Sequence, residues 1–263
     1  MRKSWLKKLY VSISSILIFV LHLPFVFAKM RPAVELKPTL PKITTSLPGD
    51  SVSVITTKIK SEHSISSIYD SLRLNLMGLS QQAFEYAMKG FNYLLQSGKV
   101  TNDKIISILD FSQPSSKKRL FVIDLNSYTV LFNTYVAHGV NSGAASAAQF
   151  SNKPESNKSS LGFYETLNTY NGHNGYSLRL EGLESGINDN ADSRAIVMHG
   201  AAYVDESLIR SQGYIGRSWG CPAVSEKLHK PIIDKIKNGT CLFIYSPDKN
   251  YLAHSRILHP AGD

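Results

Sequence analysis

From residue 117 onward, short apolar runs with strand-like composition alternate with turn-rich pieces, and this alternation constrains the fold most. The runs are RLFVIDL, TVLFNTYVAHG, SLGFYETL, YSLRLEGL, RAIVMHGA and CLFIYSP. They are rich in β-branched and aromatic residues, and stretches such as NTYNGHNG separate them. One helix is expected among them, at residues 225–237. The pattern predicts a mainly β domain over residues 117–248, a sandwich or barrel with one or two short helices, and a C-terminal tail at 249–263.

The stretch before this domain has a helical period. Ser80 is a good N-cap, and an apolar stripe runs from Ala83 to Leu95 behind it. Asn102 is expected to cap a third, short helix that carries the apolar residues between 105 and 109. We therefore expect a small helical accessory segment at residues 63–115, a separate module whose removal leaves the β domain intact.

The first 62 residues have the composition of targeting and linking segments. A basic head runs into a mostly apolar stretch that ends at Ala28, which is typical of a secretory signal. An uncleaved anchor in the inner membrane through residues 9–27 is the alternative. Residues 29–62 are rich in Pro, Ser and Thr and predict a linker. Both interpretations place the protein outside the cytoplasm, in the periplasm or cell envelope.

The charge balance bears on the partner. The chain holds 29 Lys and Arg against 20 Asp and Glu, a formal net charge of +9. No Lys/Arg-rich run accompanies this surplus, and export argues against nucleic acid, so an anionic cell-envelope polymer suits the charge better. An ordinary soluble basic surface is the other explanation.

One histidine and one cysteine stand out as a candidate catalytic pair. His199 closes the apolar run AIVM, and Cys221 follows 22 residues later in SWGC. A histidine at a strand end is well held, and a thiol on a glycine-flanked turn is accessible, with Arg217 nearby to favour an acidic thiol. Gly220 leaves room for a carbonyl to approach the backbone N–H groups around Cys221. A Cys/His nucleophile pair fits, while a core histidine and a structural cysteine remain open.

These residues carry a resemblance to a known family. The chain resembles the YkuD-like L,D-transpeptidases in its MHG motif followed by S-x-G-C, and in the runs from LFVIDLNSYTVLFNTYVAHG to LFIYSPD. The resemblance is closest to the murein L,D-transpeptidase catalytic-domain subfamily and covers residues 118–248. The resemblance implies Cys221 as nucleophile, His199 as base, and peptidoglycan stem peptides as substrate. A thioester forms with loss of D-alanine, and an amine of another stem or of an envelope protein resolves it. No cofactor or metal is implied.

The chain departs from the family pattern at two places near Cys221. These departures determine which roles we expect for the residues around the cysteine. Trp219 stands where many relatives have a second histidine, which suggests an aromatic wall beside the thiol. CPAV lacks the arginine that often follows the cysteine, so Arg217 or Arg194 is expected to bind the substrate carboxylate. Ser218 is expected to steady the turn, and the carbonyl of Gly200 or Ala201 to orient His199. His138, in VAHG, is expected to be a structural histidine at a strand end.

Three alternatives stay open. Water in place of an amine makes the same protein an L,D-carboxypeptidase. A sortase-like transpeptidase shares the His–Cys–Arg order, but the usual T-L-x-T-C strand is absent. In a non-catalytic envelope-binding module, Cys221 and Cys241 form a disulfide.

Overall fold

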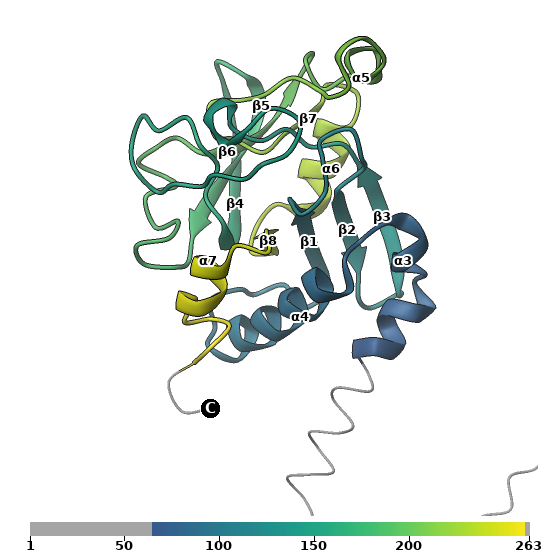
Figure 1. Cartoon of the computed structure of the whole chain (residues 1–263). Coiled ribbons are helices and arrows are strands. Elements are labelled where there is room, and N and C mark those ends of the chain that lie inside the picture. The colour runs from purple at the N-terminus through teal and green to yellow at the C-terminus, as the bar shows by residue number, and fades with distance from the viewer. Residues whose placement is uncertain (1–64, 261–263) are drawn as a thin grey trace, which may run out of the picture. The chain divides into compact units, whose positions relative to one another are not determined.

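One eight-stranded sheet organises the computed structural model of the chain, which describes residues 65–260 (Figure 1). The signal or anchor expected at residues 1–28 and the linker expected at 29–62 lie outside these residues. Within residues 65–260 no helix has both the length and the apolar character needed to cross a membrane. The expected fold class, a mainly β domain preceded by a small helical segment, is confirmed.

The sheet order is β3-β2-β1-β8-β4-β5-β6-β7. The β1–β8 and β6–β7 pairs are parallel, and the other pairs are antiparallel. The strands are β1 (Ile105–Asp110), β2 (Leu120–Asp124), β3 (Thr129–Thr134), β4 (Gly162–Gly172), β5 (Gly175–Gly182), β6 (Val197–Ala201), β7 (Ala223–Ser225) and β8 (Cys241–Tyr245). The helices are α3 (Leu74–Met77), α4 (Gln81–Gln96), the 3-10 turn η1 (Val140–Ser142), α5 (Glu206–Gln212), α6 (His229–Ile236) and α7 (Lys249–His254). Residues 65–71 are also helical.

The two ends of the sheet are joined by the chain that follows β3. The Ala137 N–H donates to the Ala223 carbonyl at 2.8 Å, so this segment bridges to β7, the strand at the opposite end of the sheet order. A second bridge joins Gly139 to Ser218. The sheet therefore nearly closes on itself. We call the line of contacts between residues 137–140 and 218–223 the seam.

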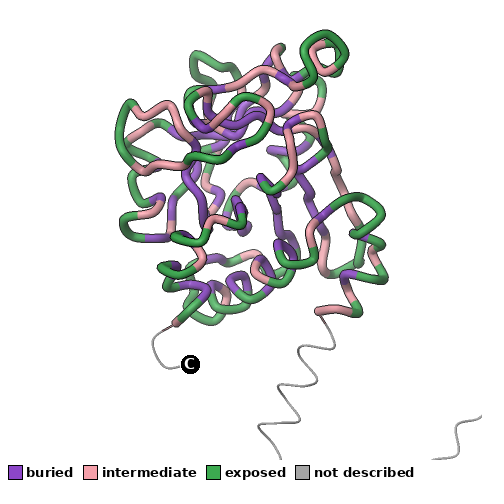
Figure 2. The backbone as a smooth tube through the Cα atoms, in the orientation of Figure 1, coloured by how far each residue is buried: buried purple, intermediate pink, exposed green. Residues whose placement is uncertain are grey.

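The third helix expected at residues 105–109 is wrong, because this segment is strand β1. It lies between β2 and β8 in the sheet, and all six of its residues are buried. Figure 2 shows β1 among the buried segments at the centre of the fold. The domain boundary expected near residue 115 thus falls between two hydrogen-bonded strands, β1 and β2.

Helix α4 begins where the sequence predicts and packs on the sheet by a close approach. The Ser80 hydroxyl accepts the Ala83 N–H as an N-cap, and the apolar stripe from Ala83 to Leu94 is buried. The helix packs against β1 and β8. A Cβ on Gly90 would lie 2.0 Å from the Phe163 ring of β4, so only glycine allows this contact. Phe163 in turn stacks on Phe243 of β8 at 4.1 Å between centroids.

The C-terminal end of the chain is packed, although the sequence analysis treats it as a tail. Tyr251 of α7 and Leu258 are buried. Tyr251 donates its hydroxyl to Glu184, a buried carboxylate that also accepts the Phe163 N–H and the Ser255 hydroxyl. These bonds fasten α7 to the start of β4.

Candidate active site

His199 is held on both sides by the sheet. Strand β6 places it opposite Ser177 of β5 and opposite Ala223 of β7. Its side chain is buried, and Nδ1 lies 2.9 Å from the carbonyl oxygen of Gly200. A carbonyl only accepts, so Nδ1 carries the proton and Nε2 is left as the basic nitrogen. Of the two carbonyls considered from the sequence, Gly200 supplies the one in contact.

Cys221 lies on a turn that Ser218 ties together. The Ser218 hydroxyl accepts the Gly220 N–H at 3.1 Å and donates to the Cys221 carbonyl at 2.6 Å. The backbone of Ser218 bonds across the seam, its N–H to the His138 carbonyl and its carbonyl to the Val140 N–H. The turn is therefore fixed internally and against the far end of the sheet.

Gly220 is required by the backbone of this turn. Its φ is +124°, a region that residues with a side chain rarely adopt. A Cβ there would also lie 2.9 Å from the Lys158 carbonyl and 3.0 Å from Ile196. The Gly220 N–H is already bonded to Ser218. Within residues 65–260, the Cys221 N–H has no hydrogen-bond acceptor, so it is a free donor on the turn.

The thiol of Cys221 lies beside the strand that carries His199. Its Sγ is 3.4 Å from the Val197 N–H, which donates to it, and the S–H donates to the Ala195 carbonyl at 3.6 Å. Val197 precedes His199 by two residues on β6. Among the residues that the structure describes, no hydrogen bond joins the His199 imidazole to the Cys221 thiol.

The surroundings favour the neutral forms of both groups. Burial raises the pKa of the Cys221 thiol, and the Val197 N–H and the Arg194 charge offset only part of this effect. Burial also lowers the pKa of His199, against the effect of the Gly200 carbonyl. The acidic thiol expected from the sequence is therefore wrong, because the sulfur is enclosed by the start of β6. At neutral pH both the Cys221 thiol and the His199 imidazole are therefore uncharged.

The guanidinium of Arg194 is engaged in hydrogen bonds within the protein. Its Nη1 donates to the Ser151 carbonyl and the Ser160 hydroxyl at 2.8 and 2.5 Å, and its Nη2 to the Ser156 hydroxyl and the Lys158 carbonyl at 3.2 and 2.7 Å. All four acceptors belong to the loop at residues 151–160, whose Lys158 carbonyl lies against Gly220. Arg194 thus anchors this loop behind the turn that holds Cys221.

The guanidinium of Arg217 forms fewer hydrogen bonds within the protein than that of Arg194. Its guanidinium donates one bond, from Nη1 to the Gly143 carbonyl at 3.2 Å, and lies 5.7 Å from the Tyr214 ring. Trp219 between Arg217 and Cys221 is 81% exposed, and it does not line the pocket beside His199. The indole therefore lies in solvent next to the turn.

His138 is enclosed in the core. It is fully buried, and the Arg119 guanidinium donates to its Nδ1 at 2.7 Å while Nε2 donates to the Gly143 carbonyl at 3.2 Å. Burial, with the Arg119 charge, lowers the pKa of His138 to about 4. The ring is thus neutral, and its backbone carbonyl supports Ser218.

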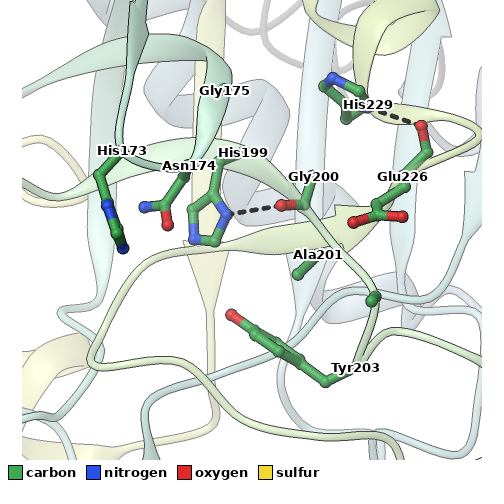
Figure 3. A pocket seen from close by; sticks show the side chains of 10 residues that line it. His173, Asn174, Gly175, His199, Gly200, Ala201, Tyr203, Glu226 and His229 are labelled. Carbon is green, nitrogen blue, oxygen red and sulfur yellow. Dashed lines mark hydrogen bonds between the residues drawn. The ribbon is translucent and has the colours of Figure 1, made fainter.

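A pocket of about 500 Å³ opens beside His199 (Figure 3). Its walls come from the β4–β5 turn, the end of β6 with the loop after it, and the start of α6. The lining residues are His173, Asn174, Gly175, His199, Gly200, Ala201, Ala202, Tyr203, Glu226 and His229. A Cβ on Gly200 would lie 2.7 Å from the His229 ring, so Gly200 lets this ring pack against β6.

Tyr203 lines the pocket, and its phenol has a raised pKa. Burial and the negative charge of a Cys221 thiolate raise the pKa of Tyr203 to about 12. Tyr203, Glu226 and His229 are not among the site residues expected from the sequence. No spacing signal marks these residues, because they meet only through the pairing of β5, β6 and β7.

The structure does not support the disulfide alternative. Cys221 and Cys241 are both free thiols, and Cys241 is buried in β8, so the disulfide of a non-catalytic module is absent. Among residues 65–260, no group of three or more His, Cys, Asp or Glu side chains is placed to hold a metal ion.

The site thus sets the thiol of Cys221, on a glycine turn, against the strand that carries the oriented His199, in a nearly closed β domain. The chain belongs to the L,D-transpeptidase catalytic-domain family, which residues 76–245 match. The match reaches back over α4 and β1, whereas the sequence analysis begins the resemblance at residue 118.

Solved structures of L,D-transpeptidases resemble the chain at low identity. One from Mycobacterium smegmatis is 14% identical, with a TM-score of 0.34, 54% of this chain covered and 59% of the other. One from Stackebrandtia nassauensis is 13% identical, with a TM-score of 0.34 and coverage of 62% and 68%. The cell-shape protein Pgp2 from Campylobacter jejuni is 13% identical, with a TM-score of 0.38 and coverage of 62% and 57%. The chain thus spans less than two thirds of the mycobacterial protein's length. No curated protein is significantly similar in sequence.

Proposed function

We propose that the protein is an exported L,D-transpeptidase that uses Cys221 to transfer peptidoglycan stem peptides. The observation that carries this proposal is the contact between the Cys221 sulfur and the Val197 N–H, because it sets a thiol beside the strand of the oriented His199 within the family match. The export signal or anchor at residues 1–28 and the periplasmic location are part of the proposal.

The chemistry begins with proton transfer within the neutral pair. The thiol rotates from the Ala195 carbonyl toward His199, whose Nε2 takes the proton as the sulfur attacks the carbonyl of the third, L-configured residue of the stem. The Cys221 N–H is the donor placed to stabilise the oxyanion. His199 then gives its proton to the departing D-alanine, and a thioester remains on Cys221.

An amine resolves the thioester and forms a cross-link, whereas water releases a tripeptide. The experiment that tests the proposal gives disaccharide tetrapeptides to the protein lacking residues 1–28 and measures free D-alanine and the products by mass spectrometry. We expect D-alanine release with cross-linked dimers. Tripeptides alone would identify an L,D-carboxypeptidase, and absence of D-alanine would contradict the proposed function.

We further expect Arg217 to bind the substrate carboxylate, since the donors of Arg194 are engaged by the loop at 151–160. Replacing Arg217 with alanine removes a charge-assisted hydrogen bond and should raise KM roughly tenfold. Arg210→Ala is the matched control, because Arg210 is an exposed arginine on α5 outside the pocket beside His199. An unchanged KM in Arg217→Ala would show that the carboxylate is bound elsewhere.

A further inference from the structure

The pocket beside His199 has an electrostatic character opposite to that of the chain. The chain carries a formal net charge of +9, yet no lysine or arginine lines this pocket. Its lining includes one carboxylate, that of Glu226, and the imidazoles of His173, His199 and His229. A volume of about 500 Å³ suits a side chain with part of its peptide. The pocket therefore favours a cationic group of modest size.

Glu226 is free to bind such a group. Its carboxylate forms no ion pair and accepts no hydrogen bond from the residues that the structure describes. Its backbone carbonyl instead accepts Nδ1–H of His229 at 2.7 Å, which fixes the start of α6 at the pocket wall. Figure 3 shows Glu226, Tyr203 and His199 around one open space.

We propose that this pocket binds the primary amine of the acyl acceptor, with the Glu226 carboxylate recognising its ammonium group before the free amine reaches the thioester. This inference rests on the proposed function. It makes Glu226 a specificity-determining residue that favours an amine over water. Arg217, which we expect to bind the donor, lies outside this pocket against Gly143 and Tyr214.

His199 lines the same pocket and so can carry the proton released when the amine attacks the thioester. The ammonium group first loses one proton to solvent. The amine nitrogen then attacks the thioester carbon, the new C–N bond replaces the C–S bond, and the second proton passes through Nε2 of His199 to the departing sulfur. The products are an amide and the free Cys221 thiol.

Two amines of different charge test the role of Glu226 during turnover. With disaccharide tetrapeptide as donor at pH 7.5, Nα-acetyl-L-lysine supplies a charged primary amine and hydroxylamine an uncharged one. Glu226→Gln should lower the ratio of lysine to hydroxylamine products roughly tenfold, because only the charged amine loses a charge-assisted bond. Glu181→Gln, an exposed glutamate on β5 outside the pocket, should leave this ratio unchanged. An unchanged ratio in Glu226→Gln would overturn the proposal.

A binding measurement separates this inference from the proposed function. Binding of Nα-acetyl-L-lysine to the resting protein, followed by NMR shifts of His229 and Tyr203, does not require turnover. Binding that Glu226→Gln weakens, in a protein that releases no D-alanine, would support the pocket and contradict the reaction. A wild-type protein that releases D-alanine but shows no Glu226-dependent binding or product ratio would contradict the pocket alone. Absence of both D-alanine release and binding would overturn both.

Discussion

Replacing Cys221 with alanine should reduce D-alanine release on the order of 10⁴-fold or more, because a methyl group cannot form the thioester on which every later step depends. The fold should survive. The Cys221 side chain forms its hydrogen bonds with Ala195 and Val197, and the bonds of the turn come from Ser218 and from backbone atoms. Release of D-alanine is measured alongside the thermal unfolding transition of each protein.

Cys241 provides the matched control. It is the other cysteine of the chain, fully buried in β8. Cys241→Ala should keep D-alanine release while lowering the free energy of unfolding by about 1 kcal/mol, a typical value for a small buried side chain. Iodoacetamide should accordingly label Cys221 and spare Cys241 in the folded wild-type protein. Undiminished D-alanine release by Cys221→Ala would show that another group is the nucleophile.

A chain that begins at residue 113 should fail to fold. It lacks β1, the strand between β2 and β8, and α4, whose apolar stripe covers β1 and β8. Both neighbouring strands would expose unpaired edges and apolar side chains to water. We expect loss of the cooperative unfolding transition in circular dichroism and loss of D-alanine release.

A chain that begins at residue 65 is the comparison for this truncation, since it keeps every element that the structure describes. It should unfold cooperatively and retain D-alanine release. If the chain from residue 113 were soluble, folded and active, the helical segment would be an independent module, as the sequence pattern suggests.

The strands that are flanked by turn residues in the sequence could be predicted, whereas β1 could not. The β2–β3 hairpin, β4, β5, β6 and β8 each coincide with an apolar run set off by turn residues. In β1 the run IISIL lacks alternation because both faces are buried, and such a run has no period that distinguishes strand from helix. A capping residue before it, Asn102, then favours the wrong interpretation. Its side chain accepts the N–H groups of Lys104 and Ile105 at the start of the strand instead.

Some residues of the candidate site can likewise be predicted from the sequence, and others cannot. His199, Cys221 and Ser218 lie in short sequence motifs, so the sequence alone marks them as candidate site residues. The direction of an arginine side chain cannot be inferred from the sequence. Arg194 points toward the loop at 151–160 because that loop offers four hydrogen-bond acceptors. Glu226 stands far from His199 along the chain and reaches its pocket only through strand pairing and the placement of α6. Residues of this kind carry no spacing signal.

Because of the seam, we expect the turn around Cys221 to form late in folding. Ser218 and Ala223, which flank Cys221, take their positions from residues 137–140, some eighty residues earlier in the chain. Contacts between such distant segments form slowly, because a long loop must close before they stabilise anything. A partly folded chain therefore contains the reactive cysteine without the turn, the oriented donor or the neighbouring strand. On the proposed function, acyl transfer begins only in molecules whose sheet has closed, so reactivity toward substrate is itself a measure of complete folding.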